Sequence, residues 1–119
     1  MAWMIYGANG YTGRLVAEAA AAAGERPVLA GRSDAAVRAV ADRSGSPWRA
    51  FPLTQPKLEG IDLVLHCAGP FSATSRPMVD ACLRSAAHYL DITGELDVIE
   101  AVMARDAEAR AAKDRKSVV

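Results

Sequence analysis

The feature that most constrains this chain is a run of closely spaced glycines near its start. Gly7, Gly10 and Gly13 directly follow an apolar stretch at residues 2–6, and an alanine-rich tract comes immediately after them. This order predicts a strand, a tight turn and a helix. A turn of this kind presents backbone N–H groups and a helix N-terminus to a pyrophosphate. The spacing is G-x-x-G-x-x-G rather than the commoner G-x-G-x-x-G, so the rest of the sequence has to support that interpretation.

Size and charge favour one globular domain that binds neither nucleic acid nor a membrane. The chain has 119 residues, of which 51% are hydrophobic, and this is enough for a single domain with a core. Fourteen basic and fourteen acidic residues give a net charge of zero, with no basic block to bind an anionic partner. No apolar run approaches the length of about 20 residues that spans a bilayer.

The cysteines and the start of the chain favour a reducing, cytoplasmic compartment. Cys67 and Cys82 match no metal-site or disulfide spacing, so we expect no metal. The first apolar stretch begins almost directly after Met1, which leaves no room for a signal peptide. We therefore expect a cytoplasmic protein with free thiols.

Apolar runs alternate with helical periodicity along the whole chain. Strands are expected at residues 2–6, 27–31, 48–51, 61–68 and 88–92. The fourth is apolar along nearly its whole length, which is typical of a parallel strand buried on both faces. The alternation predicts an α/β fold, a Rossmann-type doubly wound parallel sheet of about five strands, in a single domain over residues 1–113. Right-handed crossovers then bring together the loops that follow the first and fourth strands.

Several residues predict where the helices begin. Thr12 and Ser33 are the expected N-caps of the first two helices. Thr93 is the expected N-cap of a last helix that runs from about Glu95 to the end. Pro77 is expected in the first turn of the third helix, where the missing N–H of a proline costs no hydrogen bond. The periodicity of the first helix predicts an inward face made of Leu15, Val16, Ala19, Ala20 and Ala23.

Each glycine of the first turn has an expected task in a dinucleotide site. Gly7 permits the tight exit from the strand, and Gly10 lets the backbone approach the phosphates. Gly13 lets the helix pack closely against the sheet. The alternative is a generic glycine turn, which any α/β protein can contain.

The residues after the second strand bear on the choice of cofactor. An NAD site places Asp or Glu there, about 20 residues after the turn, to accept hydrogen bonds from the ribose hydroxyls. This chain has Gly31, Arg32 and Ser33 instead. A guanidinium and a hydroxyl suit a 2′-phosphate, which Arg binds with paired hydrogen bonds. We therefore expect NADP rather than NAD, and the alternative is a solvated surface arginine.

A loop of small residues follows the fourth strand. Cys67, Ala68, Gly69 and Pro70 would let the nicotinamide ribose of a dinucleotide lie against the backbone. No base that would activate Cys67 is identifiable, so we expect a small buried hydrophobe rather than a nucleophile. His66, inside the strand, is expected to be a packed core histidine.

Polar side chains cluster where the fifth strand ends. Alternation places Tyr89, Asp91 and Thr93 on one face of the sheet. Asp91 is a candidate to hold a backbone or a ribose group, and Glu95 to lie in the first turn of the last helix. Structural and catalytic roles both stay open for this cluster.

Taken together, these segments resemble the NADP-binding domain of the saccharopine dehydrogenase-like family, which includes bacterial trans-acting enoyl reductases. The segments that carry the resemblance are residues 5–14, 29–33, 67–72, 77–83 and 88–95. They recur in the family's order from residue 4 to about residue 112. The first is shared with several reductases, and the last two together are much more specific.

The resemblance implies an NADP(H)-binding domain of an oxidoreductase. At the pyrophosphate it implies Gly7, Asn9, Gly10, Tyr11, Thr12 and Gly13. At the adenosine end it implies Arg32 and Ser33, and near the nicotinamide Cys67, Ala68, Gly69 and Pro70. Family members continue into a larger domain that binds a small-molecule substrate, and this chain lacks it, so no catalytic residue can be carried over.

Two alternatives stay open at this stage. N-acetyl-γ-glutamyl-phosphate reductases share a similar Gly-Tyr-Thr-Gly turn, but they need a catalytic cysteine in a motif that Cys67 does not match. A module of a different class would bind NADP without turnover, like regulators built on reductase folds. Detectable hydride transfer by a full-length version of the protein would argue against such a sensor.

The last six residues differ in character from the rest. Residues 114–119, Asp-Arg-Lys-Ser-Val-Val, match one reading frame of a common sequencing adapter, whose next codon in that frame is a stop. We expect a non-native tail here, and a natural charged tail is the alternative. Resequencing the locus decides between them, because a native stop codon after Val119 would refute the adapter hypothesis.

Overall fold

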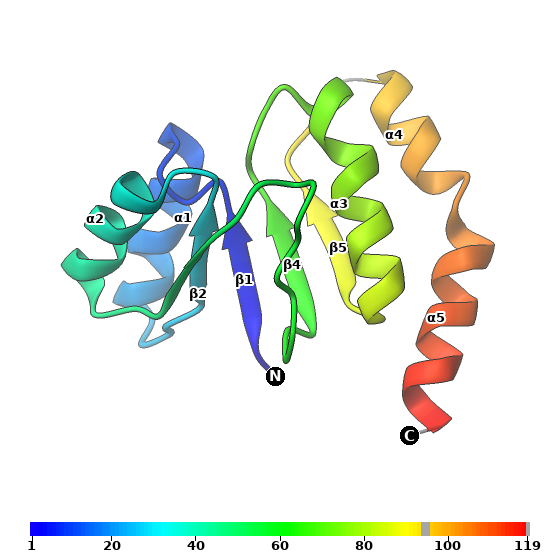
Figure 1. The fold of residues 1–119 in the computed structure, drawn as a ribbon, viewed down its shortest axis with the longest axis horizontal. Coiled ribbons are helices and arrows are strands. Elements are labelled where there is room, and N and C mark those ends of the chain that lie inside the picture. The colour runs from blue at the N-terminus through cyan, green and yellow to red at the C-terminus, as the bar shows by residue number, and fades with distance from the viewer. Residues whose placement is uncertain (94–95, 119) are drawn as a thin grey trace.

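The strands form one parallel sheet. The computed structural model describes residues 1–93 and 96–118, and their side chains except those of residues 96 and 113–118. The strands are β1 (Trp3–Tyr6), β2 (Val28–Gly31), β3 (Trp48–Ala50), β4 (Leu63–His66) and β5 (His88–Asp91). Their order across the sheet is β3-β2-β1-β4-β5, and every pairing is parallel (Figure 1). The expected Rossmann-type doubly wound sheet is confirmed.

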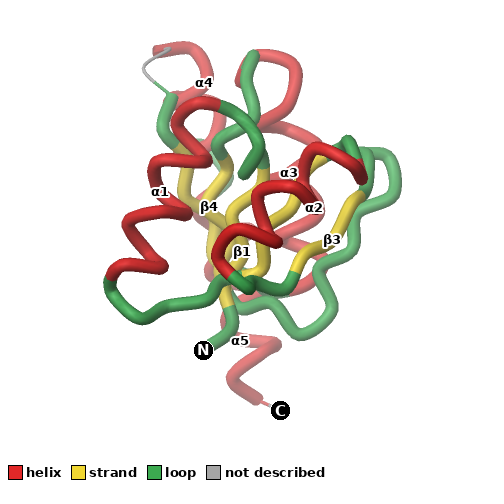
Figure 2. The backbone as a smooth tube through the Cα atoms, turned by 90° about the vertical axis from the view of Figure 1, so that its left-hand side faces the viewer, coloured by secondary structure: helices red, strands yellow, loops and turns green. Residues whose placement is uncertain are grey.

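Helices cover the two faces of the sheet. They are α1 (Tyr11–Ala22), α2 (Asp34–Ser44), α3 (Phe71–Ser85), α4 (Leu96–Met103) and α5 (Asp106–Val118). The first two lie beside β1 and β2, whereas α3 lies beside β4 and β5 with α4 and α5 outside it (Figure 1). In Figures 1 and 2 the end of α5 and the N-terminus lie at the same end of the molecule.

Alternate residues of the central strands supply two separate cores. Met4 and Val64 point toward α3, where they pack with Met78. Ile5 of β1 points to the opposite face, where it packs with Val37 of α2. All five of these side chains are fully buried, as expected for strands covered on both faces.

The start and the inward face of α1 differ from expectation. The helix begins at Tyr11 with Gly10 as its N-cap, so the prediction that Thr12 is the cap is wrong. Its buried residues are Gly13, Ala17 and Ala20, whereas Leu15 is 49% exposed. Of the predicted inward face only Ala20 is buried and Val16 half-buried, because the contact of Gly13 with the turn sets the rotation of the helix.

The third helix begins earlier than predicted. It starts at Phe71, with Pro70 as N-cap, so Pro77 lies inside the helix rather than in its first turn. A proline there cannot donate a backbone hydrogen bond to the carbonyl one turn earlier. The helix runs on through this position because Met78, Ala81 and Cys82 after it are buried in the core between α3 and the sheet.

The expected last helix is divided into α4 and α5. The break lies at residues 104–105, where the Arg105 side chain forms an ion pair with Asp80 of α3 at 2.6 Å. Arg105 also pairs with Glu108 in the first turn of α5. The expected start of this helix at Glu95 lies outside the described residues. The backbone of α5 is helical across residue 113, the expected domain boundary.

Candidate cofactor site

Hydrogen bonds to β2 fix the glycine turn. Gly7 has φ of +87°, a conformation that favours glycine. The N–H groups of Gly7 and Ala8 both donate to the carbonyl oxygen of Ala30, at 2.8 and 3.0 Å. The N–H of Gly10 donates to the carbonyl oxygen of Gly7 at 3.0 Å. The turn is therefore closed by a hydrogen bond of its own and tied to the neighbouring strand.

The N-terminus of α1 has neither a capping side chain nor an acidic residue. Its N-cap, Gly10, makes no side-chain hydrogen bond, and the first turn contains no Asp or Glu. By contrast, Ser33 caps α2 by accepting a hydrogen bond from the N–H of Ala36 at 3.4 Å, and Asp34 lies in that first turn. Free N–H groups and an unopposed helix dipole favour an anion. The start of α1 therefore fits a pyrophosphate.

Two glycines of the turn have no room for a side chain. A Cβ on Gly13 would lie 2.1 Å from the carbonyl oxygen of Gly7, and a Cβ on Gly7 would lie 2.7 Å from the backbone nitrogen of Ala68. A Cβ on Gly10 would lie 3.3 Å from the same Gly7 oxygen, and this glycine is exposed. Gly7 and Gly13 thus serve the packing of the turn, whereas Gly10 leaves backbone open to solvent.

The turn and the loop after β4 are in contact. The close approach of Gly7 to Ala68 joins them directly. The N–H of Cys67 also donates to the carbonyl oxygen of Tyr6 at 2.8 Å, which extends the pairing of β1 with β4. The prediction that the loops after the first and fourth strands meet is confirmed.

The turn is also packed against the end of β2. The side-chain oxygen of Asn9 lies 2.7 Å from the point that a Cβ on Gly31 would occupy. Arg32 follows directly and is exposed, and within the described part of the chain it makes no hydrogen bond or ion pair. A free guanidinium next to the turn is the arrangement that a 2′-phosphate site needs.

The predicted site residues gather at one edge of the sheet, the arrowhead ends of the strands in Figure 1. The turn after β1 and the first turn of α1 carry Gly7, Asn9, Gly10, Tyr11, Thr12 and Gly13. The end of β2 carries Arg32 and Ser33, and the loop after β4 carries Cys67, Ala68, Gly69 and Pro70. Tyr11 is 75% exposed, so its ring is accessible to a ligand. Their roles in binding remain predictions.

Cys67 is unsuited to nucleophilic attack. Burial raises the pKa of its thiol above the usual value, which keeps the sulfur protonated near neutral pH. A thiol is a much weaker nucleophile than a thiolate. Cys67 is half-buried rather than buried as expected, and it packs against the core that contains Ile5 and Val37.

His66 is a buried histidine held by a residue that sequence reasoning missed. It is fully buried, and its Nε2 lies 2.9 Å from the hydroxyl oxygen of Thr74. Its Nδ1 has no hydrogen-bond partner among the described residues. Burial lowers the pKa of His66 to about 4, so the ring is neutral at pH 7. Thr74 was missed because the sequence placed the start of α3 near Pro77.

The neutral state of His66 predicts acid sensitivity. Its pKa in the folded chain is about 4, against 6.5 for a free imidazole. Between these pH values the unfolded chain binds a proton that the folded chain does not, so the free energy of unfolding falls as pH falls. We expect a loss of about 2 kcal/mol between pH 7 and pH 5, measured by urea unfolding.

A matched pair of variants isolates this effect. The loss should disappear in His66→Gln and persist in His88→Gln, because His88 is exposed. An equal pH dependence in wild type and His66→Gln would contradict the assignment.

Asp91 has a structural task at the end of β5. It accepts a hydrogen bond from the Tyr89 hydroxyl at 2.7 Å and one from the Thr93 N–H at 3.2 Å. Burial, and then the hydrogen bond to Asp91, raise the pKa of Tyr89. Of the two roles that the sequence left open for Asp91, the structure therefore shows the binding of a backbone group, the Thr93 N–H. Glu95 lies outside the described residues.

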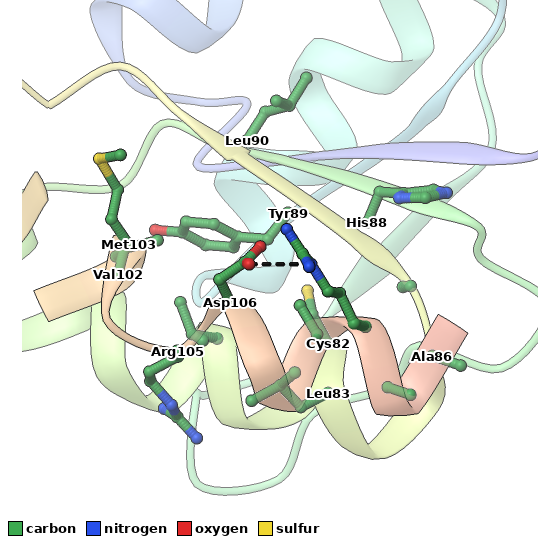
Figure 3. Close-up of a pocket in the computed structure, with 15 residues that line it drawn as sticks. Cys82, Leu83, Ala86, His88, Tyr89, Leu90, Val102, Met103, Arg105 and Asp106 are labelled. Atoms are coloured by element: carbon green, nitrogen blue, oxygen red, sulfur yellow. Dashed lines mark ion pairs between the residues drawn. The ribbon is translucent and has the colours of Figure 1, made fainter. Parts of the chain in front are cut away.

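A pocket of about 640 Å³ lies away from this edge, between α3, β5 and the last two helices (Figure 3). Its wall includes Cys82, Tyr89, Val102 and Met103, and an ion pair joins Asp106 to Arg110 at 2.9 Å. None of the predicted cofactor residues lines it. It therefore takes no part in the candidate site.

Metal and membrane features were searched across the described residues. Among them, no three His, Cys, Asp or Glu side chains are grouped so that they could bind a metal ion. None of the helices in the described ranges combines the length and apolar character needed to cross a bilayer.

Comparison with known proteins identifies the family. Residues 3–118 match the family described as the saccharopine dehydrogenase NADP binding domain. The chain belongs to this family. The resemblance noted in the sequence is thereby confirmed, and the match favours the saccharopine dehydrogenase NADP-binding domain over the alternative drawn from N-acetyl-γ-glutamyl-phosphate reductases.

Relatives of this saccharopine dehydrogenase NADP-binding domain include mycobacterial proteins. A trans-acting enoyl reductase of Mycobacterium bovis is 37% identical over 105 residues, which cover 78% of this chain and 25% of that protein. The protein of the same name from Mycobacterium leprae has the same identity and coverage. The chain thus spans about a quarter of the length of the curated relatives it matches.

Solved structures share the fold of the NADP-binding domain. A nucleoside-diphosphate-sugar epimerase from Pseudomonas aeruginosa superposes with a TM-score of 0.63 at 24% identity, covering 76% of this chain and 32% of its own. A conserved protein of unknown function from Silicibacter pomeroyi has a TM-score of 0.54 at 25% identity, covering 74% and 32% respectively. These likenesses support the Rossmann-type fold.

Proposed function

We propose that this chain is the NADP(H)-binding domain of a longer oxidoreductase whose substrate is held by another part of the protein. The observation that carries the proposal is the N-terminus of α1, which has neither a capping side chain nor an acidic residue in its first turn. It opens at the edge where the loops after β1 and β4 meet. Dinucleotides bind at such a topological switch point in doubly wound sheets.

Each part of the cofactor has a group of residues to hold it. The first turn of α1 and Gly10 would bind the pyrophosphate through backbone N–H groups. Arg32 and Ser33 would bind the 2′-phosphate, with the Ser33 hydroxyl donating while its oxygen caps α2. The loop at residues 67–70 would support the nicotinamide half. NADPH supplies a hydride when bound, and the domain supplies binding and orientation.

We propose that the substrate and the catalytic residues belong to the part of the protein outside this chain. The relatives named as enoyl reductases are about four times as long as the segment they share with it. An enoyl or imine compound that is reduced by hydride transfer is the kind of substrate that would fit a relationship to these enoyl reductases. A sensor that binds NADP without turnover is the competing function, and hydride transfer by a full-length version would exclude it.

The choice of NADP over NAD is tested at Arg32. We expect Arg32→Ala to weaken NADPH binding about 10- to 100-fold, because a hydrogen-bonded charge contributes about 1.5–3 kcal/mol. NADH binding should change less than about twofold, since NADH has no 2′-phosphate. Titration followed by the fluorescence of the reduced nicotinamide measures both affinities.

The control for this test is Arg43→Ala. Arg43 is another exposed arginine, in the last turn of α2, so its replacement removes the same charge at the end of the helix opposite to Ser33. Its NADPH affinity should stay close to that of wild type. Equal losses of NADPH and NADH in Arg32→Ala would overturn the assignment of Arg32 to the 2′-phosphate.

A further inference from the structure

We infer that Thr74 is a positioning residue, whose hydroxyl holds the loop at residues 67–70 in the shape that receives the nicotinamide half of the cofactor. The inference rests on the proposed function. It adds a residue outside the segments that the sequence assigned to the cofactor. Thr74 lies in the first turn of α3, four residues after the N-cap Pro70.

The Thr74 hydroxyl lies within hydrogen-bonding distance of two loop carbonyl groups. Its one hydrogen is donated to the carbonyl oxygen of Ala68 at 2.7 Å, and the carbonyl oxygen of Pro70 lies farther off, at 3.1 Å, as a second acceptor for the same hydrogen. A threonine in a helix often bonds the carbonyl four residues earlier, and the contact with Pro70 is of that ordinary kind. The shorter contact with Ala68 lies outside the helix. It ties the loop, rather than the helix, to Thr74.

The Thr74 hydroxyl also forms a hydrogen bond with the side chain of His66. The single Thr74 hydroxyl hydrogen is directed at the loop carbonyls, so its oxygen must accept from Nε2–H of His66 at 2.9 Å. This fixes the imidazole as the Nε2–H tautomer, with Nδ1 as the nitrogen that has no partner among the described residues. The Thr74 hydroxyl is thus the hydrogen-bond partner of a fully buried ring.

The loop is confined from two sides. Thr74 holds the Ala68 carbonyl from α3, and Gly7 of the glycine turn lies against the Ala68 backbone nitrogen on the other side. Ala68 thereby connects the part of the site expected to bind phosphate with the part expected to support the nicotinamide. Loss of the Thr74 hydroxyl should loosen only the second part, because the turn keeps its own hydrogen bonds to Ala30.

The test compares NADPH with 2′-phospho-ADP, which keeps the pyrophosphate and the 2′-phosphate but lacks both the nicotinamide and its ribose. Thr74→Val removes the hydroxyl and keeps the shape of the side chain, and Thr74→Ser keeps the hydroxyl. We expect Thr74→Val to weaken NADPH binding about tenfold, as the loss of one hydrogen-bonding group would. Binding of 2′-phospho-ADP should stay within about twofold of wild type, and Thr74→Ser should keep NADPH binding close to that of wild type.

A measurement on the wild-type chain does not depend on the variants folding. In two-dimensional NMR spectra, the amide signal of Gly69 should shift when NADPH is added and shift much less when 2′-phospho-ADP is added. Shifts of equal size with both ligands would overturn the inference.

The outcomes separate this inference from the proposed function. Equal weakening of both ligands in Thr74→Val would show a general structural role, and unchanged NADPH binding would show no role; each overturns the inference. If wild type binds 2′-phospho-ADP as tightly as NADPH, the loop does not hold the nicotinamide half, although the chain still binds the nucleotide. If wild type binds neither ligand, the proposed function fails and the inference fails with it.

Discussion

Gly13→Ala is expected to cost the chain most or all of its folded stability. The new Cβ would lie 2.1 Å from the carbonyl oxygen of Gly7 and 2.9 Å from the Cα of Ala8, and both are backbone atoms that cannot rotate away. To relieve this overlap, α1 would have to move away from the glycine turn, which is hydrogen-bonded to Ala30 of β2. We expect a loss of about 3 kcal/mol or more, at the upper end of what overpacking costs. Urea unfolding followed by circular dichroism measures it.

Gly24→Ala is the matched control, just beyond the other end of α1. Gly24 has φ of +82°, and a Cβ there would meet no atom within 4 Å. Its replacement should cost only about 1–2 kcal/mol, from the left-handed backbone conformation. A loss in Gly13→Ala no larger than that in Gly24→Ala would contradict the close packing of α1 on the turn.

Gly10→Val is expected to abolish cofactor binding while the chain stays folded. A Cβ at this position lies 3.3 Å from the nearest atom, and φ of −78° suits any residue, so the protein accommodates it with a small shift. The added methyl groups would occupy the space over the first turn of α1, where the proposed pyrophosphate approaches the backbone. We expect NADPH, NADH and 2′-phospho-ADP all to bind at least about 100-fold more weakly.

The control for Gly10→Val must change a glycine away from the site. Gly45→Ala serves, because Gly45 follows α2 and a Cβ there meets no atom within 4 Å. It should leave binding of all three ligands unchanged. Unchanged affinity in Gly10→Val, with the variant folded, would remove the glycine turn from the cofactor site.

Much of the fold could be predicted from local sequence, because the apolar runs and the capping residues form the strands and helix ends that their residue types favour. The apolar run at residues 61–68 predicted a buried strand, and its centre is β4. The meeting of the loops after the first and fourth strands followed from right-handed crossovers in a doubly wound sheet, whereas the complete strand order was not predicted. Ser33 was predicted as an N-cap from its own residue type, and its hydroxyl accepts from the N–H of Ala36.

The errors arose where contacts made only in the folded chain decided the local structure. The rotation of α1 about its axis depends on the close approach of Gly13 to Gly7. The spacing of apolar residues along the helix does not predict this approach. The break between α4 and α5 lies where Arg105 reaches Asp80 on another helix. The preference of proline for the start of a helix placed Pro77 in the first turn of α3, although that helix begins at Phe71.

The same limit applies to the candidate site. The sequence predicted the glycine turn, Arg32 and the loop at residues 67–70, because each has a recognisable residue type after a strand. Thr74 has no such signal. A role for its hydroxyl can be inferred only from the structure, in which it forms hydrogen bonds with both Ala68 and His66.

One carbonyl group of β2 has a consequence for the thermodynamics of binding. The Ala30 oxygen accepts from both Gly7 and Ala8, so the turn is immobilised by the sheet itself. The conformational entropy of the turn is therefore lost when the chain folds, and no second ordering step opposes the arrival of a ligand. Preorganisation of this kind raises affinity without a single additional contact. A small domain can in this way bind a long, flexible dinucleotide with a turn of only a few residues.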